Sequence, residues 1–342
     1  MKKAAYLALF LIALAAITFM LGPKAAAPIL NPAPVVCPIS ITELDTHLQS
    51  TESQFKTLKP GNEACITWAN DSISKTPYAI VFLHGFSASK MEGRPVTTEF
   101  AKEFGMNLFE PRLYGHGLDT TDPFIDLTPE NYIESAKEAI ALAKVIGEKV
   151  IIMGSSTGAT LGLYLAAHDP SIAAVLCYSP NIDIFDPNSK MLTGPWGLQL
   201  APLITGADFR QYDAPDEFKR YWQTRYRLEG LVVVRQVVDA TMTSSTFKQI
   251  KQPVFVGCYF KHEAAQDSVV SVAAMRNMMG QLGTTESQKR MIEFPNAGAH
   301  VITNPLRSKD VASVQLETRK FAMEVLGLRA VEPVVTSNQP TE

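Results

Sequence analysis

The chain has 342 residues, 46% hydrophobic and 19% charged, which is enough for one large globular domain with an insertion or for two small domains. Its formal net charge of −3 gives no excess of positive charge to attract phosphates, which argues against nucleic acid as a partner. The four cysteines lack the spacing of a metal site, so we expect no metal, and nothing in the sequence indicates another cofactor.

The N-terminus differs from the rest of the chain. Two lysines precede an 18-residue apolar run, Ala4 to Leu21, as in an export signal, and the run just reaches the length of a membrane span. Small residues at 25–27 would permit cleavage, whereas Pro28 disfavours it. An uncleaved anchor is therefore slightly favoured over a cleaved signal. Either outcome places the catalytic part outside the cytoplasm, whether periplasmic, secreted or membrane-anchored facing outward. We expect 1–35 to form this segment and an extended, proline-containing linker.

Apolar runs of strand length alternate with amphipathic runs of helical length along most of the remaining chain. Strands are predicted at 64–69, 78–83, 107–110, 150–153, 172–178, 253–260 and 290–294, and helices at 41–55, 97–104, 129–147, 159–167, 269–282 and 309–326. Thr128 is a suitable N-cap for the helix at 129–147. This alternation predicts an α/β fold with a mainly parallel, doubly wound sheet.

The alternation fails between Pro180 and Lys251. About 70 residues are too many for a bare connection, so we expect 181–251 to be a helical cap inserted over the catalytic face. Most of its aromatic side chains should pack within the cap itself. The core is then 36–180 plus 252–328. The polar tail at 329–342 should be disordered.

A serine motif lies between a buried strand and a helix. The apolar run 150–153 is followed by Gly154-Ser-Ser-Thr-Gly158, which fits G-x-S-x-G. The two glycines leave room for a strained turn that exposes the central hydroxyl. Ser156 is therefore the candidate nucleophile.

The serine needs a base and an acid, which follow it in the order serine, acid, histidine. Of the two histidines after the cap, His300 lies in a loop of small residues before the last helix, whereas His262 has a charged, solvated context. Asp267 is the preferred acid, although it can also cap the following helix, and Glu263 is the alternative.

The oxyanion of an acyl intermediate needs preorganised N–H donors. The backbone N–H groups of Thr157, directly after the nucleophile, and Phe86, in His84-Gly85-Phe86, are the candidates. His84 and His116 are interpreted as residues that shape their loops. A Cys37–Cys65 disulfide is an open alternative, because an exported protein permits it and it would hold the N-terminal arm to the domain.

These pieces together resemble the α/β-hydrolase superfamily, and within it the capped carboxylesterases and monoacylglycerol-lipase-like serine hydrolases. The matching segments cover roughly 62–327 in the family's order: His84-Gly85-Phe86, Tyr114-Gly115-His116-Gly117, Gly154–Gly158, Asp267-Ser-Val-Val and Gly298-Ala299-His300. The resemblance implies Ser156, Asp267 and His300 as a triad and ester hydrolysis through an acyl-enzyme. Two departures are the small Ser155 before the nucleophile and the long stretch from Phe260 to Asp267.

The sequence therefore favours a serine carboxylesterase for small or medium acyl esters, monoacylglycerols among them. A peptidase, thioesterase or C–C bond hydrolase would use the same triad. The alternative that is not an enzyme is a binding protein that keeps this fold but has lost catalysis. The oligomeric state and the acyl and alcohol preferences stay open.

Overall fold

A seven-stranded sheet forms the centre of the molecule. The computed structural model describes residues 2–70 and 72–331, so most of the predicted disordered tail lies outside the described residues. The strand order is β1 (Cys65–Thr67), β3 (Asn107–Glu110), β2 (Thr76–Leu83), β4 (Gly147–Ser155), β5 (Ile172–Tyr178), β8 (Val254–Cys258) and β11 (Lys289–Glu293). Only the edge strand β1 is antiparallel to its neighbour. The predicted mainly parallel sheet is confirmed.

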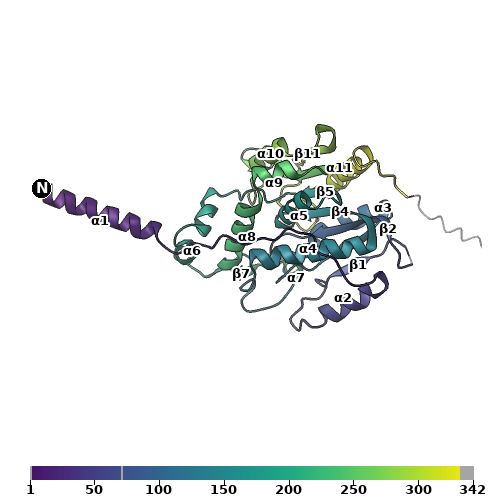
Figure 1. Cartoon of the computed structure of the whole chain (residues 1–342), viewed down its shortest axis with the longest axis horizontal. Coiled ribbons are helices and arrows are strands. Elements are labelled where there is room, and N and C mark those ends of the chain that lie inside the picture. The colour runs from purple at the N-terminus through teal and green to yellow at the C-terminus, as the bar shows by residue number, and fades with distance from the viewer. Residues whose placement is uncertain (1, 71, 332–342) are drawn as a thin grey trace, which may run out of the picture.

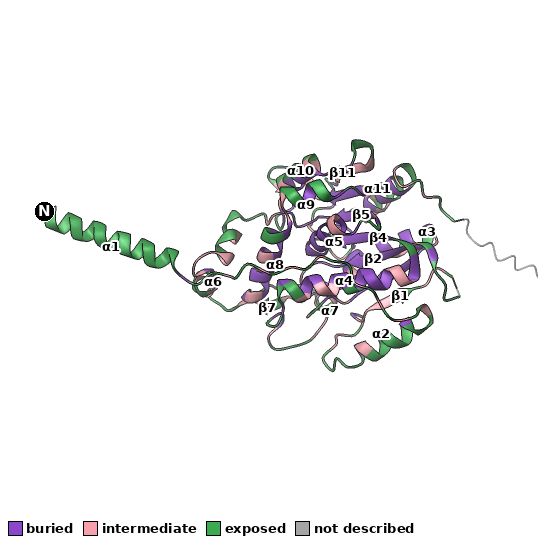
Figure 2. Ribbon diagram, viewed as in Figure 1, coloured by how far each residue is buried: buried purple, intermediate pink, exposed green. Residues whose placement is uncertain are grey.

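Helices cover both faces of this sheet (Figure 1). They are α2 (Leu44–Glu52), α3 (Val96–Glu103), α4 (Pro129–Ile146), α5 (Thr157–His168), α10 (Val272–Gln281) and α11 (Val311–Glu324). Because successive strand residues point to opposite faces, Ile152 packs with α4 and α5, whereas Ile151 and Met153 pack with α3 and α11. Thr128 caps α4 through a capping box, as predicted. Figure 2 shows the central strands as the most buried part of the chain.

The chain leaves the sheet after β5 and returns at β8. Between them it forms η3 (Pro187–Thr193), α6 (Gly197–Thr205), β6 (Phe209–Gln211), α7 (Asp216–Tyr221), β7 (Arg225–Arg227), α8 (Leu228–Thr241) and α9 (Ser244–Gln249). Phe218 and Trp222 stack at 4.4 Å and pack on Ala88 and Val301, in the loops after β2 and β11. The Gln223 N–H also donates to the Ser87 carbonyl at 2.7 Å. The segment therefore lies over loops at the carboxyl ends of the strands.

The N-terminal helix α1 (Lys2–Met20) extends away from the body, with α6 at its foot (Figure 1). The following residues are extended, as predicted, but they lie against the domain. The Trp196 N–H donates to the Pro23 carbonyl at 2.7 Å, the Gln236 amide to the Ala26 carbonyl at 2.6 Å, and the Ile29 N–H to the Glu130 carboxylate at 2.9 Å. This linker is thus fixed to both α8 and α4, which its proline content did not predict.

Three local expectations need correction. Cys37 and Cys65 are both free: Cys37 packs against the core near α4, while the Cys65 thiol contacts Lys90 and Glu110. The predicted strand at 253–260 ends at Cys258, and β9 (Phe260–His262) turns back as a hairpin with β10 (Ala265–Gln266). This hairpin accounts for the long stretch before Asp267. The helix after it begins at Val272 with Ser271 as its N-cap, so Asp267 does not cap it.

Candidate active site

Ser156 is the single residue between β4 and α5. Its backbone has φ 51° and ψ −123°, a left-handed conformation that is strained for a residue with a side chain. The Ser156 N–H donates to the Tyr178 carbonyl at 3.0 Å, and the Ser156 carbonyl accepts from the Asn181 N–H at 3.1 Å. The turn is therefore held against the end of β5.

Gly158 makes the strand–helix approach possible. A Cβ on this residue would lie 2.0 Å from the Leu83 carbonyl oxygen and 2.5 Å from that of His84. A real Cβ cannot approach backbone this closely, so the first turn of α5 would have to move away from β2. The same turn carries Ser156 and Thr157.

We predict that Gly158→Ala destabilises the protein by at least about 3 kcal/mol, because backbone atoms cannot yield as a side chain can. Gly280→Ala is the matched control: Gly280 also lies in a helix, but a Cβ added to it would meet no other part of the described chain within 4 Å. We expect this control to be neutral or to stabilise by about 0.5–1 kcal/mol. Urea unfolding of both variants measures the difference, and equal stabilities would contradict the steric explanation.

Asp267 and His300 form a hydrogen-bonded pair in which Asp267 is buried and His300 is partly exposed. The His300 Nδ1–H donates to Asp267 Oδ2 at 2.6 Å, and the Asp267 side chain is fully buried. The other carboxylate oxygen accepts from the N–H groups of Val269 and Val270 at 2.8 and 3.1 Å. The carboxylate is thereby fixed with one oxygen toward the imidazole. The alternative acid, Glu263, is exposed beside the β9–β10 hairpin and accepts from Gln266 instead.

The imidazole of His300 is favoured in its charged form. Burial lowers its pKa, but the charge and hydrogen bond of Asp267, together with the charge of Glu92, outweigh burial and raise the pKa above its ordinary value of 6.5. Such an imidazole accepts a proton more readily than a free histidine. His262 is exposed, as its charged sequence context predicted.

Ser179 connects the histidine loop to the serine turn. Its hydroxyl donates to the His300 carbonyl at 2.7 Å. Ser179 lies between Tyr178 and Asn181, whose backbones bond Ser156. The structure therefore brings Ser156, Asp267 and His300 to the same end of the sheet. Ser179 was not predicted, although its place at the end of a parallel strand was an available signal.

The loop after β2 holds Phe86 in place. The Gly85 carbonyl accepts from the Ala88 N–H at 3.2 Å and from His84 Nδ1 at 3.0 Å. Because a trans peptide directs its N–H opposite to its C=O, these bonds set the direction of the Phe86 N–H. Within residues 2–70 and 72–331, neither the Phe86 N–H nor the Thr157 N–H donates to a protein acceptor.

His84 and His116 shape the surroundings of this loop. The Leu113 N–H donates to His84 Nε2 at 3.1 Å, so His84 carries its proton on Nδ1. Burial lowers the pKa of His84 to about 4, so it stays neutral at pH 7. The His116 ring packs edge-on to Phe86, and Phe86 also packs on Tyr226 of β7. Both histidines are loop residues, as the sequence indicated.

Glu92 is a buried carboxylate that sequence reasoning missed. It is only 2% exposed, and its Oε2 accepts from the Gly85 N–H at 2.5 Å. A Cβ built on Gly85 would contact both Glu92 carboxylate oxygens, at 3.1 Å, and the Ser156 Cβ, at 2.9 Å. Glu92 therefore lies directly behind the serine turn. It follows Lys90-Met91 in a polar stretch, where nothing local distinguishes it from a surface acid.

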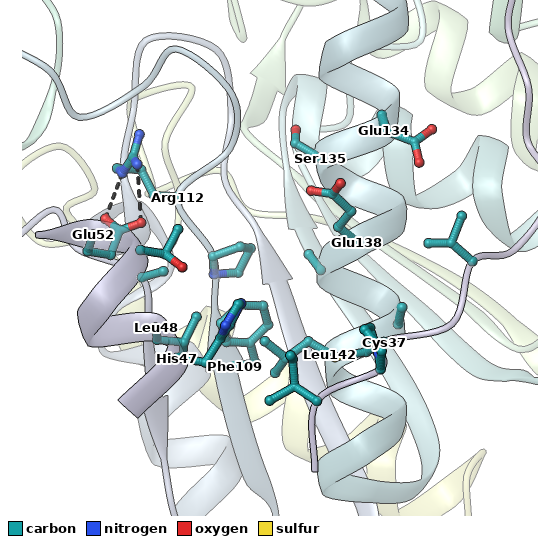
Figure 3. Close-up of a pocket in the computed structure, with 18 of the residues that line it drawn as sticks. Cys37, His47, Leu48, Glu52, Phe109, Arg112, Glu134, Ser135, Glu138 and Leu142 are labelled. Atoms are coloured by element: carbon teal, nitrogen blue, oxygen red, sulfur yellow. Dashed lines mark hydrogen bonds and ion pairs between the residues drawn. The ribbon is translucent and has the colours of Figure 1, made fainter. Parts of the chain in front are cut away.

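A large cavity lies elsewhere. It is a cleft of about 450 Å³, open to solvent, between the N-terminal arm, α2, β3 and α4 (Figure 3). Its floor is apolar, with Leu48, Phe109 and Leu142, and the Arg112–Glu52 ion pair lies at one side. None of Ser156, Asp267 and His300 lines it, so it is separate from the candidate active site.

A serine at a strained strand–helix turn, with a hydrogen-bonded histidine–carboxylate pair at the same carboxyl end of a parallel sheet, defines a nucleophile-elbow α/β protein. The model of the alpha/beta hydrolase family matches residues 80–313. This match covers more than half of the chain, and the chain belongs to that family.

The chain is also similar to individual proteins. It is 32% identical over 108 residues to the thermostable monoacylglycerol lipase of Bacillus sp. (strain H-257), which covers 32% of this chain and 42% of that lipase. The matched stretch is thus less than half the length of this relative. Among solved structures, one described with the metagenome-derived lipolytic enzymes LipS and LipT has a TM-score of 0.59 at 17% identity, covering 77% of this chain and 98% of that one. The Paleococcus ferrophilus monoacylglycerol lipase has a TM-score of 0.53 at 16% identity, covering 75% and 96%. These two structures share the fold.

Proposed function

We propose that the protein is a serine carboxylesterase that cleaves small or medium acyl esters, including monoacylglycerols, through an acyl-enzyme. The observation that carries this proposal is the placement of Ser156 at the strained turn, next to the loop that holds His300 against Asp267. The named lipase relative and the lipolytic structural neighbours support ester hydrolysis as the reaction.

The proposed mechanism uses these groups in order. Ser156 Oγ attacks the ester carbonyl while His300 Nε2 takes its proton. The N–H groups of Phe86 and Thr157 donate to the oxyanion. His300 then protonates the leaving alkoxide, and the alcohol departs. Water, deprotonated by His300, attacks the acyl-serine, and His300 returns the proton to Ser156 Oγ as the acid is released. Asp267 holds the imidazole with Nδ1 protonated and stabilises its charged form.

We propose that 181–251 is the cap that covers the acyl group. Phe86 packs on Tyr226, and a Cβ on Gly230 of α8 would lie 2.8 Å from the Phe86 ring. The segment is therefore in direct contact with the proposed oxyanion loop. An apolar cover of this kind favours acyl groups over charged groups.

The substrate class is tested by a panel of p-nitrophenyl esters of increasing acyl length, with monoacylglycerol, triglyceride, thioester and amino-acid arylamide. We expect cleavage of short and medium esters and of monoacylglycerol. Cleavage of arylamides or thioesters in preference to esters would replace the esterase proposal with the peptidase or thioesterase alternative. A protein that cleaves none of them and resists a fluorophosphonate would be a binding protein on this fold.

We further propose that α1 is an uncleaved anchor that holds the catalytic part outside the cytoplasm. The helix has 19 residues with a mean hydropathy of 2.0, and none of it is buried (Figure 2). The backbone bonds from Pro23 and Ala26 to the 181–251 segment keep the foot of α1 beside α6.

The anchor predicts membrane partitioning. In an expressing cell, we expect the full chain to sediment with membranes at high salt and to need detergent for release, whereas a chain lacking residues 1–21 stays in the aqueous fraction. Intact-mass measurement of the recovered protein is the control. A mature chain that begins near residue 28 would show a cleaved signal and contradict the anchor.

A further inference from the structure

We propose that Glu92 is a positioning residue of this site, whose buried carboxylate holds the oxyanion loop and adds a second negative charge, besides Asp267, near His300. The inference rests on the proposed function, because it concerns the protonation of the general base. Glu92 has no part in the proton transfers described above.

The first part of the inference concerns the loop. Glu92 Oε2 accepts from the Gly85 N–H at 2.5 Å, while the Gly85 carbonyl is bonded on its other side by Ala88 and His84. Both polar groups of Gly85 are thus fixed. Because Phe86 follows directly, removal of the carboxylate would loosen the peptide that presents the Phe86 N–H to an oxyanion.

The second part concerns the connection to the histidine loop. The Thr303 hydroxyl donates to the Glu92 carbonyl at 2.5 Å, and the Asn304 amide donates to the Met91 carbonyl at 2.6 Å. Both donors follow His300 by three or four residues. The backbone of Glu92 is therefore tied by two hydrogen bonds to the loop that carries the base.

The third part concerns charge. Three ionisable groups act on the imidazole: Asp267 and Glu92 favour its charged form, and Arg307 opposes it. Burial raises the pKa of Glu92 above its ordinary value of 4.5, against the opposing effects of the Gly85 N–H, the charge of His300 and the Ser155 hydroxyl. The charge of Glu92 also contributes to raising the pKa of Tyr132 and of Tyr212.

Glu92→Gln separates the two roles, because the amide oxygen can still accept from Gly85 while the charge is lost. The base must be neutral to act, so the acid limb of kcat/KM against pH reports the pKa of His300. We expect this limb to move down by roughly 0.5–1 pH unit in Glu92→Gln, while Glu92→Asp keeps it near the wild-type position. Glu92→Ala should also lower kcat more than it changes KM, because the Phe86 N–H loses its support.

Glu110→Gln is the matched control, because Glu110 is another fully buried carboxylate, paired with Arg94 and absent from the groups that act on His300. We expect Glu110→Gln to lower the melting temperature without shifting the acid side of the pH profile of kcat/KM. Should Glu92→Gln not fold, Glu92→Ser serves as the second neutral variant. NMR titration of His300, assigned with His300→Asn, follows the same shift without turnover. An unchanged His300 pKa in a folded neutral variant would overturn the inference, whereas a protein with the shift but no ester hydrolysis would overturn only the proposed function.

Discussion

Ser156→Ala is expected to lower kcat for a short p-nitrophenyl ester by about 10⁴-fold or more, with the fold intact. The hydroxyl is the only group in the proposed mechanism that bonds covalently to the acyl group, and alanine leaves just the N–H donors and the binding surface. Steady-state kinetics measure the loss, and thermal melting checks the fold.

Ser244→Ala is the control for this variant. Ser244 also lies at the start of a helix, α9, but it is exposed. Its kcat should stay within about twofold of the wild-type value, since surface substitutions away from a site have small effects. Ester hydrolysis that survives Ser156→Ala at more than a tenth of the wild-type rate would rule out Ser156 as the nucleophile.

The second large effect is expected at Asp267. Asp267→Asn should lower kcat by about 10³–10⁴-fold, because an amide can donate to His300 Nδ1 and thereby favours the tautomer with its proton on Nε2, where it cannot accept from Ser156. Asparagine has nearly the same shape as aspartate, so the structure should persist. The same ester assay and a circular dichroism spectrum measure the two outcomes.

Glu263→Gln is the matched control for Asp267→Asn, since it neutralises the other candidate acid. Glu263 is exposed and bonds Gln266, so we expect no more than a twofold change in kcat. A large loss in Glu263→Gln with little loss in Asp267→Asn would reverse the assignment of the acid.

The features that were predictable from the sequence are those in which a local pattern determines the structure. The apolar run before Gly154 and the helical run after it predicted the turn at Ser156, because strand, turn and helix are contiguous. The order of strands and helices likewise predicted a parallel sheet, since each connection is long enough for a crossover helix. His300 could be predicted because small residues precede it in a loop before the last helix.

The features that were missed depend on contacts between distant segments. Glu92 meets Gly85 and the serine turn only after β2 and β4 pair, and its own neighbours carry no sign of burial. The β9–β10 hairpin was not predicted: the predicted strand ran on to Phe260, because the residues up to Phe260 are largely apolar, and the charged residues after it showed no strand pattern. Cys37 and Cys65 were considered a possible pair because an exported protein permits a disulfide and this one would hold the N-terminal arm, whereas pairing depends on where the arm crosses the domain.

The central claim is that Ser156 carries the acyl group. It is tested most directly by incubating the full chain with a fluorophosphonate, digesting the product and locating the adduct by mass spectrometry. The account predicts one adduct per chain, on the peptide that contains Ser156, forming faster as the pH rises through the pKa of His300. A stoichiometric adduct on another residue, or none in a protein that hydrolyses esters, would contradict it.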